Sequence, residues 1–300
     1  MNVRLINRRG MALLALAALA ASGCGAVINK NSEQAGIRKS SSSLYAQLPQ
    51  DVRQRGSIRV VTGDYKVPMD FRAAGGKLVG VNVDLANALQ QRLGVKVELV
   101  AGTFDSVLGG IASGRYDTAI FTMNDTPERE KLVNFVDYAN VPSAIAVPSG
   151  NPKTVTGIND SLCGLRVTAK SGEVEATEVQ AQSRKCTSAG KEAIDLQLLQ
   201  DDGSMEQAVL TGRVNAEVSG AEALGYLVKK NPGKLALVPA NLGPQPVGMP
   251  FRKDRMALTK VVSEAWRQIL ADGTYAKIAK KWGVTAILPA KIQFNLGAGL

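Results

Sequence analysis

The stretch YDTAIFTMNDTPERE, residues 116–130, decides the fold because it joins a short strand to a well-specified helix start. Its apolar run, 117–121, has the length of a buried strand and leads into a polar turn. Thr126 is then a good N-cap, and Pro127 suits the first helical position, where its missing N–H is not needed. Glu128 favours the positive end of the helix dipole. A strand that runs directly into a capped helix predicts an α/β fold.

The first turn of this helix also carries Arg129. The exposed amides of a helix N-terminus attract anions, and a guanidinium group offers a planar fork that matches a carboxylate or a phosphate. Arg129 is therefore a candidate ligand for an anion. From this stretch alone the alternative is an arginine that pairs with a surface glutamate, which is the usual role of a single arginine.

The alternation of strand and helix continues on both sides of the stretch. Around it we predict strands at 58–61, 95–99 and 143–147 and helices at 84–93 and 105–113. The pattern then restarts, with strands at 165–169, 194–199, 215–219 and 235–238 and helices at 173–182, 204–211 and 221–230. Two helices with apolar core faces follow at 258–269 and 274–282. This order predicts two α/β units in series, with parallel sheets covered on both faces.

The N-terminus predicts export. Arg4, Arg8 and Arg9 precede an apolar run at 11–21, which is about half of the ~20 residues that a membrane-spanning helix needs. This pattern is typical of a secretory signal peptide, which we place at 1–23.

The apolar run ends in LAASGC, residues 19–24, which resembles the lipobox of bacterial lipoproteins. We therefore predict that Cys24 is acylated and becomes the new N-terminus, whereas the alternative is plain secretion with a free thiol. Residues 24–43 lack apolar periodicity and are predicted to form a flexible tether. These features predict an extracytoplasmic chain that its N-terminal lipid anchors to the cell membrane.

The two remaining cysteines, Cys163 and Cys186, are an even pair in an oxidising compartment. The simplest inference is one disulfide, and the alternative is two buried free thiols. The chain has no histidine, which excludes a Ser-His-Asp triad and a histidine-ligated metal. Neither a metal site nor a cofactor is predicted.

The net charge of +10 includes the three arginines of the signal peptide. The basic residues are scattered rather than clustered with aromatic residues, so nucleic acid is not a predicted partner. The simplest interpretation is a solvated surface near an anionic membrane, and the alternative is an anionic ligand.

Several spaced motifs carry a resemblance to a known family. They are GVNVDLANALQQRLG at 80–94, IASGRYD followed by TPERE and VNFVDY, LCGLRV and AKSG within 162–172, and DGTYAKIAKKWGV at 272–284. In this order they resemble the extracytoplasmic solute-binding proteins of polar amino acid ABC importers, related to glutamine- and histidine-binding proteins.

The resemblance implies a type II periplasmic-binding-protein fold, in which two α/β lobes joined by two crossing strands close on a ligand. The crossings would lie near 143–148 and 247–252. The first lobe would then comprise 44–148 together with 247–300, and the second lobe 149–246. The implied partners are a carboxylate-bearing small molecule and the permease of an ABC transporter, and the protein is expected to be a monomer and not an enzyme.

The resemblance also implies binding residues. Arg129 would clamp the ligand's α-carboxylate with help from Thr122 and Asn124. Phe104 aligns with an aromatic residue that stacks on the ligand, although its alternative role is core packing. In the second lobe, Ser171, Gly172 and Glu173 would complete the carboxylate cradle with their amides. The family usually has threonine at the position of Glu173, so only the backbone inference carries over.

Two positions depart from the family's pattern. The resemblance places Gly220 where the family has the aspartate that pairs with the ligand's α-ammonium group, and Lys66 where it has an aromatic residue. Neighbouring Tyr65 could swing in to replace that aromatic residue. Strand alternation points Glu217 to the face of Ser219 rather than that of Gly220, and Glu222 belongs to the next helix, so neither is expected to restore the missing charge.

These departures predict a ligand richer in negative charge than a neutral amino acid. It would be an acidic amino acid, an N-substituted amino acid or a carboxylate without a free ammonium group. A site that has lost its function, or an alignment shifted by one residue, would explain the same departures.

Two other functions remain open. Cyclohexadienyl dehydratases resemble this fold, and Glu173, Glu217 or Glu222 could serve as their catalytic acid. The third hypothesis is a ligand sensor that is not coupled to transport.

Overall fold

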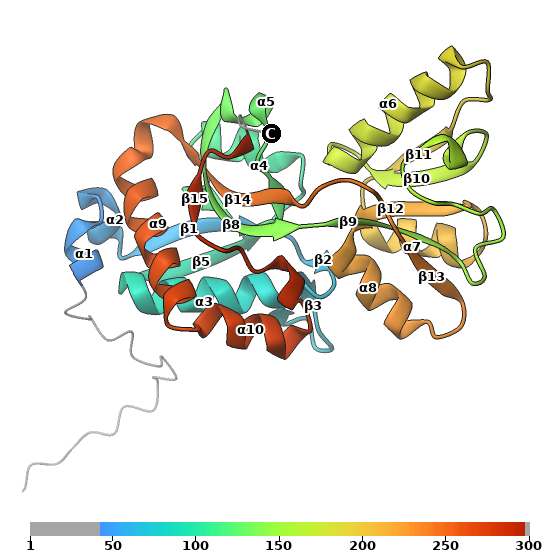
Figure 1. Cartoon of the computed structure of the whole chain (residues 1–300). Coiled ribbons are helices and arrows are strands. Elements are labelled where there is room, and N and C mark those ends of the chain that lie inside the picture. The colour runs from blue at the N-terminus through green and yellow to red at the C-terminus, as the bar shows by residue number, and fades with distance from the viewer. Residues whose placement is uncertain (1–42, 298–300) are drawn as a thin grey trace, which may run out of the picture. The chain divides into compact units, whose positions relative to one another are not determined.

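The computed structural model describes residues 43–297, which form two α/β lobes (Figure 1). The predicted signal peptide, the acylation of Cys24 and the tether as far as residue 42 lie outside the described residues. None of the helices in the described part of the chain has the length and apolar character that a membrane crossing requires.

The first lobe combines the beginning and the end of the described chain. Its strands are β1 (Ser57–Thr62), β2 (Tyr65–Lys66), β3 (Asp70–Arg72), β4 (Leu78–Val79), β5 (Lys96–Ala101), β6 (Thr118–Ala119), β7 (Met123–Asn124), β8 (Val133–Val141), β14 (Gln245–Arg252) and β15 (Gln293–Phe294). Its α-helices are α1 (Ser43–Gln47), α2 (Gln50–Arg55), α3 (Val81–Leu93), α4 (Ser106–Ala112), α5 (Pro127–Glu130), α9 (Met256–Ala271) and α10 (Thr274–Trp282). Two 3-10 turns, η2 (Lys253–Arg255) and η3 (Thr285–Ile287), complete it.

These strands form three sheets rather than one. The parallel sheet has the order β5-β1-β6, a second sheet has the order β15-β8-β14-β7, and a small antiparallel sheet has the order β2-β3-β4. The expected α/β class is confirmed. The first lobe combines parallel and antiparallel sheets, because β14 returns from the second lobe and pairs antiparallel with β7 and β8.

The second lobe is built on a single mixed sheet of order β11-β10-β12-β9-β13. Its strands are β9 (Ser143–Pro148), β10 (Arg166–Lys170), β11 (Asp195–Leu199), β12 (Ala216–Gly220) and β13 (Leu235–Pro239). Its helices are η1 (Asp160–Leu162), α6 (Val174–Ser188), α7 (Asp202–Leu210) and α8 (Ala221–Lys230).

Strand β9 shows how one sheet is covered on both faces. Ile145 and Val147 lie in one apolar cluster with residues of α6, whereas Ala144 and Ala146 lie in another with residues of α7 and α8. Successive side chains of a strand point to opposite faces, so the apolar run buries both sides of the strand.

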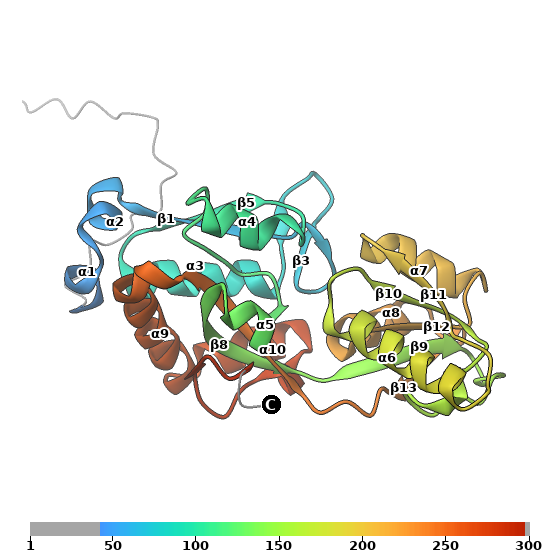
Figure 2. The same ribbon diagram turned by 90° about the horizontal axis from the view of Figure 1, so that it is seen from above.

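The chain passes between the lobes twice. The first passage follows β8 and leads through Pro142 into β9, and the second leads from β13 through residues 240–244 into β14 (Figures 1 and 2). Strand β9, which the sequence predicts as a crossing at 143–148, pairs with β12 and β13 and so belongs to the sheet of the second lobe. Likewise, β14 at 245–252 pairs with β7 and β8 of the first lobe.

The core of the first lobe contains the apolar stripe predicted at 258–269. Trp266 of α9 is fully buried and stacks on Tyr138 of β8, with ring centroids 4.7 Å apart. Tyr275 of α10 also packs against Trp266, with ring centroids 5.8 Å apart. The three aromatic residues fix the C-terminal helices to the sheet that carries the passages between the lobes.

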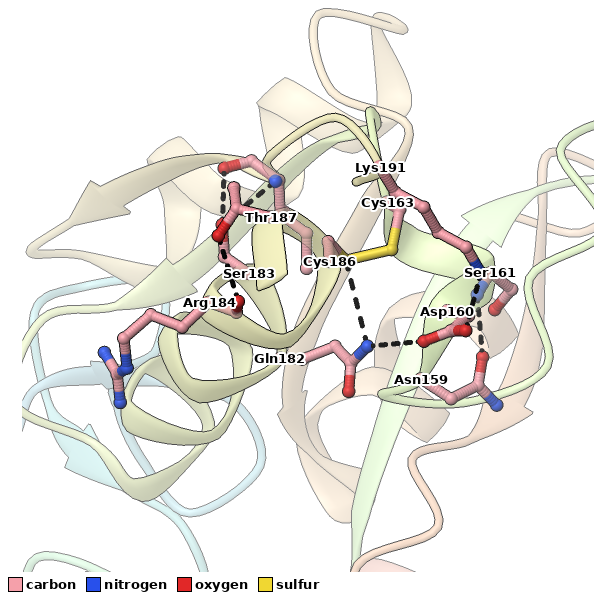
Figure 3. The surroundings of a disulfide bond; sticks show 11 residues. Asn159, Asp160, Ser161, Cys163, Gln182, Ser183, Arg184, Cys186, Thr187 and Lys191 are labelled. Atoms are coloured by element: carbon pink, nitrogen blue, oxygen red, sulfur yellow. Dashed lines mark hydrogen bonds and ion pairs between the residues drawn. A yellow bond between two sulfur atoms is a disulfide. The ribbon is translucent and has the colours of Figure 1, made fainter. Parts of the chain in front are cut away.

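A disulfide joins Cys163 to Cys186 in the second lobe, with Cα atoms 5.7 Å apart (Figure 3). Cys163 follows η1 and Cys186 lies near the end of α6, so the bond ties the entry of β10 to that helix. The side-chain amide of Gln182 donates to Asp160 and also contacts the Cys186 sulfur. The predicted disulfide is confirmed, and the alternative of two buried free thiols is wrong.

Candidate functional site

The residues singled out from the sequence converge where the lobes meet. A small cavity of about 10 Å³ lies there, and its lining comes from both lobes. The lining residues are Lys66, Thr122, Asn124, Val141, Glu173, Glu175, Gly220, Glu222 and Val247. Arg129 and Gly172 lie beside it, in a neighbouring groove of about 420 Å³ that shares Glu173 with the cavity.

Arg129 is held by the local structure that its sequence specifies. Thr126 is the N-cap of α5, and its hydroxyl oxygen accepts a hydrogen bond from the Arg129 amide at 3.3 Å. The guanidinium group lies 5.3 Å from the centre of the Phe104 ring. One terminal nitrogen donates to the Asn124 carbonyl and the other to the Gly172 carbonyl, each at 2.7 Å. Arg129 therefore connects the two lobes.

The loop that precedes Arg129 is held rigidly by a buried polar network. Thr122 has a positive φ of 51°, which is uncommon for a residue other than glycine and typical of functional loops. Its hydroxyl group accepts a hydrogen bond from Asn82 at 3.2 Å, and the same Asn82 amide nitrogen donates to Asp70 at 2.6 Å. Burial raises the pKa of Asp70 to about 7, although the bond from Asn82 opposes this shift.

Phe104 packs in the core, which is one of the two roles considered for it, and its stacking on the ligand stays a prediction. It packs edge-on against Phe121, with ring centroids 5.7 Å apart, in a cluster with other buried residues. Its face also contacts the Arg129 guanidinium, which a cation–π interaction holds in place. The ring therefore orients the candidate carboxylate anchor.

Gly172 allows the second lobe to approach this anchor closely. Its φ is 80°, and a Cβ atom there would lie 3.4 Å from Asp105 and 3.7 Å from Phe104 of the first lobe. The amides on either side are already used, because Ser171 donates to the Leu199 carbonyl and Glu173 to the Lys170 carbonyl. Two of the three amides that were expected to complete the carboxylate cradle are therefore engaged within the second lobe.

Lys66 is the second link between the lobes. It belongs to β2 of the first lobe, and its ammonium group lies 3.5 Å from Glu222 and 4.0 Å from Glu173 of the second lobe. All three side chains are more than 90% buried. Burial opposes the charge of Lys66, but attraction by Glu173 and Glu222 outweighs it and raises the pKa of Lys66 well above its usual value. Lys66 is thus a buried cation between two carboxylates.

A third link between the lobes engages Tyr65, which does not line the small cavity. The Lys170 ammonium group lies 4.4 Å from the centre of the Tyr65 ring, and it also lies 3.1 Å from Asp202. Lys170 and Asp202 were not among the residues predicted from the sequence. One sequence feature could have pointed to Lys170: it lies at the end of an apolar strand, three residues before Glu173. In the structure the two side chains form an ion pair at 3.9 Å.

The charge that Gly220 lacks is restored by Glu222, contrary to the expectation that this residue was out of reach. A Cβ atom built on Gly220 would lie 2.5 Å from one carboxylate oxygen of Glu222 and 2.6 Å from the other. Helix α8 begins directly after Gly220, so its first turn folds Glu222 back over the end of β12. The absence of a side chain at position 220 makes room for this carboxylate.

Glu222 is a buried acceptor without a donor. Its side chain is only 2% exposed, and neither carboxylate oxygen accepts a hydrogen bond from any described residue. Burial raises the pKa of Glu222, and the charge of Lys66 counteracts this. Buried polar atoms are normally satisfied, so these oxygens can accept hydrogen bonds from a water molecule or a ligand.

The other acids considered from the sequence separate in space. Glu217 of β12 pairs in register with Ala146 of β9, and its side chain faces α7. Burial raises the pKa of Glu217 well above its usual value, and repulsion by the carboxylates of Glu206 and Asp202 adds to this shift. Glu217 does not line the cavity. Glu175, which the sequence analysis did not select, does line it and accepts a hydrogen bond from Ser143 at 2.7 Å. No group of His, Cys, Asp or Glu within residues 43–297 is arranged to hold a metal ion.

Two α/β lobes with convergent polar groups between them define the class of two-lobed binding proteins. Residues 58–285 match the family of bacterial extracellular solute-binding proteins, family 3. The chain belongs to this family. It is accordingly an extracytoplasmic binding protein and not an enzyme, as the sequence predicts.

Relatives and solved structures agree with this assignment. The L-cystine-binding protein TcyJ of Escherichia coli (strain K12) is 29% identical over 233 residues, which cover 77% of this chain and 84% of the relative. The arginine-binding protein ArgT of Corynebacterium glutamicum is 24% identical over 244 residues, covering 80% and 79% respectively. A solved ancestral arginine-binding protein bound to arginine is 32% identical, with a TM-score of 0.69, and the match covers 76% of this chain and 98% of that one.

Proposed function

We propose that this chain captures a zwitterionic amino acid between its lobes and delivers it to the permease of an ABC importer. The ligand's α-carboxylate binds Arg129 and its α-ammonium group binds Glu222. The observation that carries this proposal is the buried Glu222 carboxylate, whose two oxygens accept no hydrogen bond within the described chain. An ammonium group has three N–H donors and a positive charge, which match this unsatisfied acceptor.

Arg129 supports the other half of the proposal. Its two terminal nitrogens each use one hydrogen for a backbone carbonyl, and a guanidinium group has five N–H donors in total. Donors therefore remain for a carboxylate in the adjoining groove. Glu173 lines both this groove and the cavity that contains Glu222, which supports a single site for the two anchoring residues.

The proposal revises the expectation of an acidic or amine-free ligand. That expectation rested on a pocket that has lost an anion and gained a cation. Glu173, Glu175 and Glu222 all line the cavity, whereas Lys66 is its one lysine or arginine, so the pocket is rich in anions. The arginine- and cystine-binding relatives also support an amino acid as the ligand.

The transport role and the membrane anchor belong to the same proposal. We infer that lipid on Cys24 holds the protein at the membrane beside its permease and that it acts as a monomer. Loss of uptake of the bound amino acid in a deletion strain would support transport. Unchanged uptake with a lost response to the ligand would favour a sensor instead.

Isothermal titration calorimetry with matched pairs of ligands tests the binding mode. Each amino acid is compared with the same acid without its α-amine, using the wild type, Glu222→Gln and the control Glu264→Gln, a half-exposed glutamate of α9. We expect the amine-bearing ligands to bind more tightly to the wild type and the preference to disappear in Glu222→Gln only. Tighter binding of the amine-free acids to the wild type would overturn the proposal.

A further inference from the structure

The ammonium group of Lys66 lies where the proposed ligand would place its own. Among the described residues it is the lysine or arginine that pairs with Glu222, at 3.5 Å, and it also pairs with Glu173 at 4.0 Å. Both distances are longer than a hydrogen bond, so Lys66 balances the charge of Glu222 without satisfying its oxygens. A cation that is held by charge alone can be exchanged for one that also donates hydrogen bonds.

The space around Lys66 leads to the same conclusion. With its side chain in place, the cavity between the lobes measures about 10 Å³. Such a volume accommodates about one water molecule at most, far less than an amino acid. An amino acid can therefore enter this cavity only if Lys66 leaves this position or the lobes move apart.

We propose that Lys66 is a built-in competitor of the ligand, which holds the lobes together until a ligand ammonium group displaces it from Glu222. This inference rests on the proposed function, because it assigns the same carboxylate to the ligand. Lys66 comes from β2 of the first lobe and both of its partners come from the second, so its ion pairs act directly on lobe closure.

The competition has a consequence for specificity. A displaced Lys66 remains attached to the wall of the site, where it repels a ligand with a second positive charge and attracts one with a second carboxylate. Lys66 therefore favours acidic over basic amino acids, although the site itself is rich in anions.

The experiment compares Lys66→Met, which removes the charge at similar length, with Lys66→Arg and with Lys77→Met. Lys77 is an exposed lysine of the same lobe and serves as the matched control. Hydrogen–deuterium exchange of the full-length protein without ligand reports on residues 65–66, 172–174 and 220–222. We expect faster exchange at all three segments in Lys66→Met and no change in Lys77→Met.

Calorimetry with L-arginine and L-glutamate gives the second readout. If Lys66 occupies the site about nine-tenths of the time, its removal raises the affinity for L-arginine roughly tenfold. The affinity for L-glutamate should rise less or fall, so that the ratio of the two affinities shifts towards arginine. If Lys66→Met does not fold, Glu173→Gln weakens the same link and should also accelerate exchange.

The outcomes separate this inference from the proposed function. If Lys66→Met exchanges like the wild type and the affinity ratio is unchanged, Lys66 is not a competitor, whereas the amino acid site stands. If the wild type binds neither amino acid but Lys66→Met still exchanges faster, the ion pairs close the lobes and the proposed ligand is wrong.

Discussion

The carboxylate of Glu222 lies in the space that a side chain on Gly220 would fill. A Cβ atom there would come within 2.5 Å of it, so the two positions cannot both carry a side chain as they stand. One glycine and one glutamate two residues later thus supply an anion where the family's pattern has an aspartate.

The relationship between Gly220 and Glu222 can be tested by moving the carboxylate from position 222 to position 220. Gly220→Ala should displace the Glu222 carboxylate and weaken amino acid binding about tenfold or more, because the ammonium group loses its partner. Gly220→Asp combined with Glu222→Ala should recover much of this loss, whereas Glu222→Ala alone should not. Calorimetry of the three variants checks the prediction, and equal affinities for the single and double variants would contradict it.

Arg129 should be the main carboxylate anchor. Arg129→Ala should cost about 2 to 5 kcal/mol of binding free energy, because a buried ligand carboxylate loses its charge partner. Arg129→Lys keeps the charge but loses the fork and the paired bonds to the Asn124 and Gly172 carbonyls, so it should bind at an intermediate level. Affinity within twofold of the wild type in Arg129→Ala would place the carboxylate elsewhere.

The disulfide should contribute to the stability of the second lobe. Replacing both Cys163 and Cys186 by serine should lower the free energy of unfolding by roughly 3 kcal/mol, because the unfolded chain regains the freedom of the closed loop. Denaturant melts compare the variant with the wild type under oxidising conditions. A wild type whose melt is the same with and without reductant would contradict the prediction.

Two buried carboxyl groups predict how stability changes with pH. Burial and then the charge of Asp137 raise the pKa of Asp125 to about 8, and burial raises the pKa of Asp137 to about 6. The amides of Gly297 and Leu296 donate to them, so the pair fastens the end of the described chain beside the Arg129 loop. The folded protein therefore holds protons that the unfolded chain releases near pH 4.

These two groups should accordingly stabilise the fold most below about pH 4, where the unfolded chain also holds the protons. Their contribution to the free energy of unfolding should fall as the pH rises through about 6 and about 8. Asp125→Asn imitates the protonated pair, so its melting temperature should decrease less between pH 5 and pH 8 than that of the wild type. Asp195→Asn, at an exposed position, is the control. A variant with the wild-type pH dependence would contradict the assignment.

Local sequence signals predicted the elements well. The N-cap at Thr126, Pro127 at the first helical position and Gly94 after α3 are all found as expected, because they depend on backbone groups within one turn. Helix boundaries moved by a few residues: α6 extends from the predicted 182 to Ser188, and α3 begins at Val81 rather than 84. The order of the strands in the sheets depends on long-range pairing and was not predicted.

By itself, the sequence determined the α/β class, the position of Arg129 at a capped helix start and the pairing of two cysteines, since each depends on local chemistry or on counting. Only the tertiary structure decided the charge of the pocket. The side chains of Lys66, Glu173 and Glu222 come from three separate segments, and their distances depend on how two lobes meet. The alternation of side chains along a strand correctly predicted that Glu217 faces away from the cavity. It could not predict that the first turn of α8 brings Glu222 back over the end of β12. Glu222 therefore restores a charge that the sequence alone counted as lost.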